Sequence, residues 1–148
     1  MPDQPAIQQL PSDNTFLKLR AGFPKLCPEE LFAYFTEPDL LQRWWSPQAT
    51  VEPKLGGAYH LSWPEMDWHL RGVYTDFEPA HWLGFTWHWD QEPDLPTRQV
   101  NLLIEPAGTG SRLTITHGRY DQSRRDQDDR QSHLEGWTYF LGQLLALE

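Results

Sequence analysis

Apolar and polar residues alternate most clearly over residues 82–89, where the sequence reads Trp-Leu-Gly-Phe-Thr-Trp-His-Trp. Successive side chains of a β-strand point to opposite faces, so the alternation predicts a strand here. One face of that strand carries large apolar side chains, namely Leu83, Phe85, Trp87 and Trp89. Such a wall of rings either fills a hydrophobic core or lines an apolar pocket.

The same alternation predicts further strands on both sides of this segment. They cover about residues 15–23, 49–52, 58–63, 68–77, 98–105 and 112–119. Phe77 breaks the alternation, which predicts a β-bulge near Asp76. The sequence Gly108-Thr109-Gly110 separates the last two strands and predicts a hairpin turn. We therefore expect the strands to form an antiparallel sheet.

Three helices are predicted by start signals and by helical spacing of apolar residues. Pro28 begins a short helix that ends near Tyr34, and a second short helix follows Thr36 and ends near Trp44. A long helix over about residues 126–147 has an apolar face, formed by Leu134, Trp137, Leu141, Leu144 and Leu145. Because the strands are grouped together and do not alternate with helices, the predicted fold class is α+β. The long helix needs an apolar surface to lie on, and the sheet offers one.

A length of 148 residues is typical of one domain. Residues 1–13 are rich in Pro, Gln and Asp, so we expect a mobile arm there, followed by a single domain over residues 14–148. The sequence has no secretory signal and no run of 18 apolar residues, so no membrane-spanning helix is expected. Cys27 is the single cysteine, which excludes an internal disulfide and fits a reducing compartment. We therefore expect a cytoplasmic protein.

The chain is acidic, with a formal net charge of −9 at pH 7. This charge argues against nucleic acid and anionic membranes as partners, because their phosphates attract clusters of Lys and Arg. The six histidines are not paired at the i, i+4 spacing of a helical zinc site, and there is no Cys-x-x-Cys, so we expect no metal. We also expect no cofactor and assign no catalytic residue. The sequence leaves a homodimer open.

A series of short motifs, in order along the chain, resembles a known family. They include Thr36-Glu37-Pro38 with Trp44-Trp45, Gly56-Gly57-x-Tyr59, Gly72-x-Tyr74, Leu83-x-Phe85-Thr86-Trp87, Arg112-Leu113-x-Ile115-Thr116-His117 and His133-x-x-Gly136-Trp137. From about residue 14 onward the chain resembles the family named after the activator of heat-shock-protein-90 ATPase, within the START-like, helix-grip (SRPBCC) superfamily.

The resemblance implies a helix-grip fold. In this fold a curved antiparallel sheet, here of about six to seven strands, wraps around the long C-terminal helix. Two short helices after the first strand close one end, and a hydrophobic cavity lies between helix and sheet. Members of the superfamily include lipid and hormone carriers, aromatic cyclases and chaperone cofactors, so function has to be inferred from the site.

We expect inward-facing side chains of the sheet and the long helix to line this cavity. The candidate ligand-binding residues are Tyr59, Leu61, Trp63, Trp68, Tyr74, Phe85, Trp87, Trp89, His117 and Trp137. Trp and Tyr have polar tips that need partners when buried, so their abundance favours a pocket with hydrogen-bonding corners. The alternative is that these rings simply fill the core.

Two residues near this predicted cavity allow more than one interpretation. His117 continues the inward register of its strand, and is either a core histidine bonded to a backbone carbonyl or a pocket group that orients a ligand or moves a proton. Gly136 interrupts the long helix, and either permits close approach to the sheet or leaves room for a ligand beside Trp137.

We therefore expect a domain that binds a hydrophobic or aromatic small molecule, and not an enzyme. One alternative is a cyclase- or hydrolase-type enzyme in which His117 or Tyr74 transfers a proton, which requires a carboxylate or Tyr within about 3 Å of His117. The other is a chaperone-associated or protein-interaction module, which an exposed apolar patch outside the cavity would favour.

Overall fold

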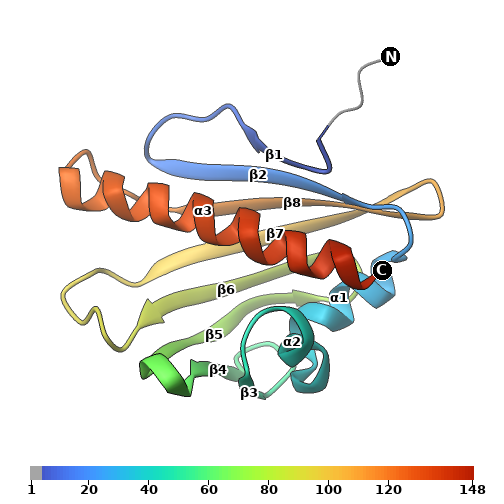
Figure 1. Ribbon diagram of the computed structural model, residues 1–148, viewed down its shortest axis with the longest axis horizontal. Helices are drawn as coiled ribbons and strands as arrows, with labels where there is room; N and C mark the ends of the chain where they lie inside the picture. Colours follow the sequence, from blue (N-terminus) through green and yellow to red (C-terminus); the bar gives the residue numbers. More distant parts are fainter. Residues whose placement is uncertain (1–4) are drawn as a thin grey trace.

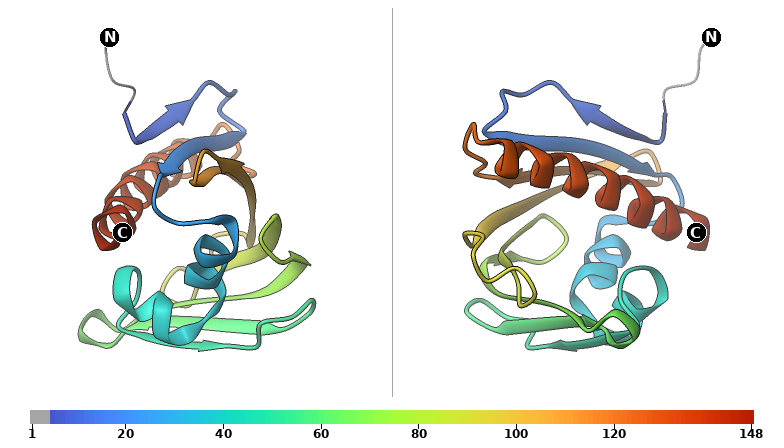
Figure 2. Two further views of the ribbon diagram at one scale, coloured as in Figure 1. Left: turned by 90° about the vertical axis from the view of Figure 1, so that its right-hand side faces the viewer. Right: turned by 60° about the vertical axis from the view of Figure 1, so that its left-hand side comes forward.

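Within residues 5–148, which the computed structural model describes, the chain forms one sheet of eight antiparallel strands with a long helix across its concave face (Figures 1 and 2). The strands are β1 (Ile7–Leu10), β2 (Phe16–Phe23), β3 (Gln48–Val51), β4 (Ala58–Trp63), β5 (Trp68–Glu78), β6 (Trp82–Trp89), β7 (Arg98–Ala107) and β8 (Gly110–Gly118). The helices are α1 (Pro28–Thr36), α2 (Pro38–Trp44), the short 3-10 helix η1 (Pro64–Met66) and α3 (Arg124–Leu147).

The strands lie in the order β1-β2-β8-β7-β6-β5-β4-β3 across the sheet. From β3 to β8 each strand pairs with the next one along the chain, and β8 then pairs with β2. The two short helices follow β2 and lie at one end of the concave face (Figure 2). This arrangement confirms the predicted α+β class and the helix-grip fold.

The core lies between the sheet and α3. Along β7 the inward side chains Val100, Leu102 and Ile104 are at most 1% exposed. The buried apolar side chains of α3 are Trp137, Leu141 and Leu144. Burying a large apolar side chain stabilises a fold by about 1.5–3 kcal/mol, so this contact is a major source of the free energy that holds α3 on the sheet.

Helix α3 begins at a polar cap. The Ser123 hydroxyl accepts a hydrogen bond from the backbone N–H of Asp126 at 3.1 Å, so the helix starts slightly earlier than the apolar spacing predicts. No helix among residues 5–148 is both long enough and apolar enough to cross a membrane.

The two short helices meet at a single residue. Glu37 ends α1, where its backbone N–H donates to the Ala33 carbonyl, and Pro38 then begins α2. A proline is well placed at the first helical position, because the N–H that it lacks would have no partner there. Trp45, directly after α2, is 7% exposed and stacks on Trp44 with ring centroids 5.2 Å apart. The short helices therefore place the Trp45 ring in the core.

The N-terminal segment differs from the mobile arm expected over residues 1–13. Residues 1–4 of that segment lie outside the described residues, but residues 7–10 form β1, which pairs with β2 along its whole length. This strand makes the sheet one strand larger than expected. Its sequence, Ile-Gln-Gln-Leu, is too short and too polar to stand out as a strand. Pairing with the unsatisfied backbone groups at the edge of β2 stabilises it without a strongly apolar face.

The register of β5 against β6 shifts between Tyr74 and Asp76, which confirms the predicted bulge. Near this bulge, Gly72 pairs with Tyr59 of β4, and the Tyr59 hydroxyl donates to the Thr86 carbonyl oxygen of β6. The Tyr59 side chain thus spans β5 at the position of Gly72. A Cβ atom at Gly72 would lie 2.1 Å from the Thr86 carbonyl oxygen, so this approach requires glycine.

We expect Gly72→Ala to lower the free energy of unfolding by about 1–3 kcal/mol, because the added methyl group forces β5 and β6 apart. Urea denaturation followed by circular dichroism measures this change. Gly22→Ala is the matched control, since Gly22 also lies in a strand and a Cβ there meets no atom of residues 5–148 within 4 Å. Equal stability of the two variants would contradict the role of Gly72.

Candidate functional site

A cavity of about 420 Å³ lies between α3 and the ends of β4, β5 and β6. Its lining consists mainly of aromatic side chains with a smaller polar group, formed by Trp45, Trp63, Trp68, Trp87, Trp89, Gln91, Glu92, Asp129, Ser132, His133, Gly136, Trp137 and Phe140. Gln91 is exposed and Trp68 is 43% exposed, so the cavity reaches the surface beside the loop that follows β6.

The sheet side of the cavity is built by three neighbouring strands. Trp63 at the end of β4 pairs with Trp68 at the start of β5, and Trp89 ends β6. The ring of Trp89 is inclined by 70° to that of Trp68 and by 89° to that of Trp87. These rings therefore form walls that meet at steep angles and do not stack into a closed layer.

The helix side of the cavity comes from one face of α3. Asp129, His133, Gly136, Trp137 and Phe140 recur at spacings of three or four residues, which places them on one stripe of the helix. A Cβ atom at Gly136 would meet no atom of residues 5–148 within 4 Å. Gly136 thus leaves open space at the cavity wall, and of its two interpretations this is the one that fits the packing.

Half of the predicted site residues line this cavity, and half do not. Trp63, Trp68, Trp87, Trp89 and Trp137 belong to its lining. Four others, Tyr59, Leu61, Tyr74 and Phe85, surround a separate void of only about 10 Å³ with Phe35 and Leu41. The rings of this second group pack edge to face and fill their end of the core.

Trp45 explains the division, because it contributes to the lining of both the cavity and the small void. Its ring lies 5.2 Å from that of Trp137 and 5.9 Å from that of Trp87, centroid to centroid. Trp45 therefore stands between the two spaces as a partition. Alternation along a strand predicts the face on which a residue lies, but not which side of this partition it occupies.

Several cavity residues were absent from the predicted set. Trp45 and His133 belong to motifs noted in the sequence, and Phe140 lies on the same stripe of α3 as Trp137. A helical projection through Trp137 would have found these α3 residues. Gln91 and Glu92 lie in an irregular loop, where no periodic pattern indicates which side chains point inward.

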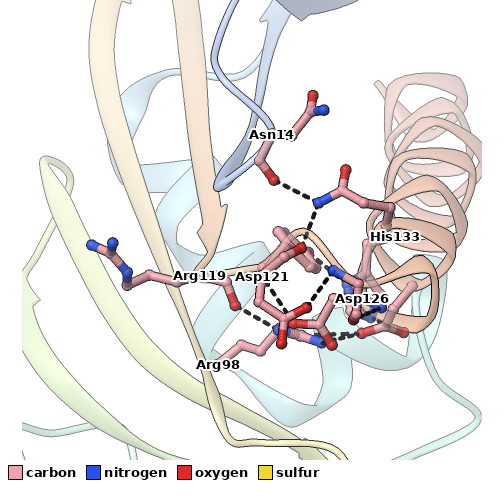
Figure 3. A network of polar contacts seen from close by, with 10 residues as sticks. Asn14, Arg98, Arg119, Asp121, Asp126 and His133 are labelled. Carbon is pink, nitrogen blue, oxygen red and sulfur yellow. Dashed lines mark hydrogen bonds and ion pairs between the residues drawn. The ribbon is translucent and has the colours of Figure 1, made fainter.

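A buried ion-pair network joins β7 to the start of α3 (Figure 3). Arg98 is 3% exposed, and its Nη2 lies 3.1 Å from Asp126 Oδ1 and 2.9 Å from Asp129 Oδ2. Its Nη1 donates to the Arg119 carbonyl oxygen, and its guanidinium covers the Tyr120 ring at 4.4 Å from the centroid. Two carboxylates and one carbonyl oxygen thus satisfy the buried cation.

The His117 imidazole lies behind the cavity wall and stacks on that of His133, which belongs to the lining. The rings of His117 and His133 are 4.5 Å apart between centroids and nearly parallel, at 12°. The indole Nε1–H of Trp137 donates to His117 Nδ1 at 3.0 Å, so the proton of a neutral His117 ring is on Nε2. That Nε2 atom is buried and has no hydrogen-bond partner in the described part of the chain. His117 is therefore a core histidine bonded to an indole, and not to the expected backbone carbonyl.

His133 is the imidazole that reaches the cavity. Its Nδ1 is 2.7 Å from the Tyr120 hydroxyl, and its Nε2 is 3.5 Å from Asp129 Oδ1. A carboxylate requires a donor, so we assign the proton to Nε2, and the Tyr120 O–H then donates to Nδ1. The one basic lone pair of the neutral ring is consequently occupied within the protein, which leaves His133 poorly suited to take a proton from a substrate.

Both histidines are held in the neutral form. Burial lowers the pKa of His117 well below its ordinary value, and the neighbouring His133 and Arg98 act in the same direction. Burial lowers the pKa of His133 to about 4, against the opposing effect of the Asp129 carboxylate and with the support of Arg98. Among residues 5–148 no group of three or more His, Cys, Asp or Glu side chains is arranged to hold a metal ion.

A curved antiparallel sheet that grips a C-terminal helix, with a cavity between them, defines the START-like (SRPBCC) class of helix-grip proteins. Residues 25–147 match the family described as "Activator of Hsp90 ATPase homolog 1-like protein", and the chain belongs to this family.

Relatives and solved structures agree with this assignment. The human activator of 90 kDa heat shock protein ATPase homolog 1 is 31% identical over 117 residues, which cover 78% of this chain and 32% of that protein. The chain thus spans about a third of the length of the curated relatives it matches.

Two bacterial crystal structures share the fold over nearly the whole chain. Protein MLL2253 from Mesorhizobium loti has a TM-score of 0.77 at 22% identity, over 89% of this chain and 95% of that chain. A protein from Rhodobacter sphaeroides has a TM-score of 0.77 at 25% identity, over 95% of this chain and 96% of that chain.

We expect Arg98→Met to lower the free energy of unfolding by about 3–5 kcal/mol, because it leaves two carboxylates near the core without their cation. Urea denaturation measures the change. Arg112→Met is the control, since Arg112 forms an ion pair with Glu105 in which both side chains are exposed. The control should change stability by about 1 kcal/mol or less. Similar losses in both variants would contradict the central role of Arg98.

We expect stability to fall as the pH drops from 6.5 to 4. In the unfolded chain the His133 side chain takes up a proton near pH 6.5, whereas in the folded protein it stays neutral until about pH 4. Acid therefore favours the unfolded state. The groups that face His133 are Asp129, Arg98, Tyr120 and His117. The loss attributable to His133 is at most about 3 kcal/mol.

Urea denaturation at several pH values measures this slope. His133→Asn keeps an acceptor for the Tyr120 hydroxyl but does not titrate in this range, so its stability should vary less with pH. The same substitution at exposed His81 should leave the slope unchanged. An unaltered slope in His133→Asn would show that other groups cause the acid sensitivity.

Proposed function

We propose that this protein is a binding domain that holds a hydrophobic or aromatic small molecule in the 420 Å³ cavity. The observation that carries the proposal is the cavity itself, since its volume falls in the range of about 300–1,000 Å³ typical of small-molecule sites. Protein interiors are normally packed as densely as organic crystals, so an open space of this size beside filled core is unusual. Its aromatic walls offer apolar contact, and its polar end offers hydrogen-bonding groups.

A binding role is better supported than catalysis. His117, the residue considered for proton transfer, is bonded to Trp137, and no carboxylate or Tyr bonds its Nε2 within residues 5–148. Tyr74, the other residue considered, is buried beside the small void and does not line the cavity. Burial raises the pKa of Tyr74 above its ordinary value, which opposes loss of its proton.

The remaining alternative, a chaperone-associated module, rests on the name of the curated relatives. That name describes proteins of which this chain matches about a third of the length. The cavity gives a specific observation for ligand binding, so we favour that function. We further propose that the domain acts in a reducing compartment such as the cytoplasm, in keeping with its single cysteine, Cys27.

A neutral fluorescent probe, N-phenyl-1-naphthylamine, tests the proposal. We expect its fluorescence to rise on addition of the protein, in a saturable titration. Gly136→Leu should abolish binding, or weaken it at least about tenfold, because the new side chain extends into the cavity. The helix itself should tolerate the change, since Leu favours a helix by nearly 1 kcal/mol over Gly.

Gly142→Leu is the matched control. Gly142 lies on the same helix, a Cβ there also meets no atom of residues 5–148 within 4 Å, and it is not part of the cavity lining. The control should bind the probe as the unmodified protein does. Equal binding of the probe by the two variants would overturn the proposal.

A further inference from the structure

The polar end of the cavity carries more negative than positive charge. The buried cation of Arg98 is shared by two carboxylates, Asp126 and Asp129, which leaves one negative charge in excess. Glu92 adds another carboxylate to the cavity lining, and it forms no ion pair within residues 5–148. Burial and the charge of Asp129 raise the pKa of Glu92, against the opposing effects of Arg125, Arg98 and His88.

The aromatic walls also favour positive charge. An indole ring presents a negative face that attracts a cation lying within about 6 Å of its centroid. The steep angles between Trp68, Trp89 and Trp87 turn their rings in different directions around one space. Several indole rings at steep angles resemble the aromatic cages that bind quaternary ammonium groups.

On these two observations we propose that the cavity selects a cationic ligand, a quaternary or protonated amine attached to an apolar or aromatic body. This inference rests on the proposed function and specifies its ligand. The amine lies between the tryptophan walls and Glu92, while the apolar body occupies the space beside Gly136. Anionic ligands such as fatty acids are disfavoured by the same carboxylates. The net charge of −9 also attracts a cation before it enters the cavity.

Two ligands of nearly equal shape distinguish the effect of ligand charge on binding from the effect of ligand size. Benzyltrimethylammonium carries a quaternary nitrogen, and neopentylbenzene has carbon at the same position. Titrations followed by the indole N–H resonances in ¹H–¹⁵N spectra measure both affinities and locate the site. We expect the unmodified protein to bind the cation at least about tenfold more tightly, and we expect added salt to reduce that preference.

Two variants test the residues that are responsible. Glu92→Gln should weaken binding of benzyltrimethylammonium about fivefold or more and leave that of neopentylbenzene unchanged. Glu52→Gln is its control, because Glu52 is exposed at the far end of β3 and is not part of the cavity lining. Trp68→Leu removes one aromatic ring and should weaken binding of benzyltrimethylammonium more than binding of neopentylbenzene. Trp82→Leu is its control, since Trp82 lies at the other end of β6 from Trp89 and outside the cavity lining.

The outcomes distinguish this inference from the proposed function. If N-phenyl-1-naphthylamine binds but the cation has no advantage over neopentylbenzene, the cation preference is wrong and the binding function stands. If none of the three probes binds, both proposals fail. If the cation binds but Glu92→Gln and Trp68→Leu behave like their controls, the cation site lies elsewhere and the inference is overturned.

Discussion

The buried guanidinium of Arg98 determines how α3 meets the sheet, and the cavity depends on that contact. A charge that is 3% exposed is tolerated only when opposite charges lie against it, and the two that do are Asp126 and Asp129 on α3. These carboxylates are three residues apart and so lie on one face of the helix. Holding them against β7 fixes the rotation of α3 about its own axis. His133 and Gly136, further along the same stripe, therefore face the sheet where the cavity lies.

The cavity remains open where large aromatic rings stand at steep angles to one another and do not pack face to face. At one end of the concave face, Tyr59, Tyr74 and Phe85 meet edge to face and leave almost no space. At the other end, α3 has a glycine in place of a larger residue, and the tryptophans of β5 and β6 stand at steep angles to one another. Trp45, which directly follows α2, separates the two ends. One continuous aromatic face of the sheet is thus divided into packed core and open cavity.

In the proposed binding site, one residue would serve both stability and ligand recognition. Asp129 pairs with Arg98 to hold α3, contacts the Nε2 side of His133, and also faces the cavity. The carboxylate is therefore held in place before any ligand arrives, and it does not have to be reorganised on binding. The neutral pair of His117 and His133 backs this wall without adding positive charge, which preserves the negative character of the polar end.

The sequence by itself determined the family and, except for β1 and the short helix η1, the secondary-structure elements and their order. Alternation gave the boundaries of β4 and β6 and the bulge in β5, because side-chain direction along a strand is a local property. It could not indicate β1, whose stability comes from backbone pairing with β2 and not from an apolar pattern.

Only the tertiary structure decided which aromatic residues border open space. Trp87 and Phe85 lie on the same face of one strand, yet one lines the cavity and the other fills the core. The difference depends on Trp45, Gly136 and the rotation of α3, all of which come from distant parts of the chain. The raised pKa of Glu92 and the lowered pKa of His117 likewise depend on burial by other elements. Periodicity records the direction in which a side chain points, whereas a cavity depends on what lies opposite that side chain after folding.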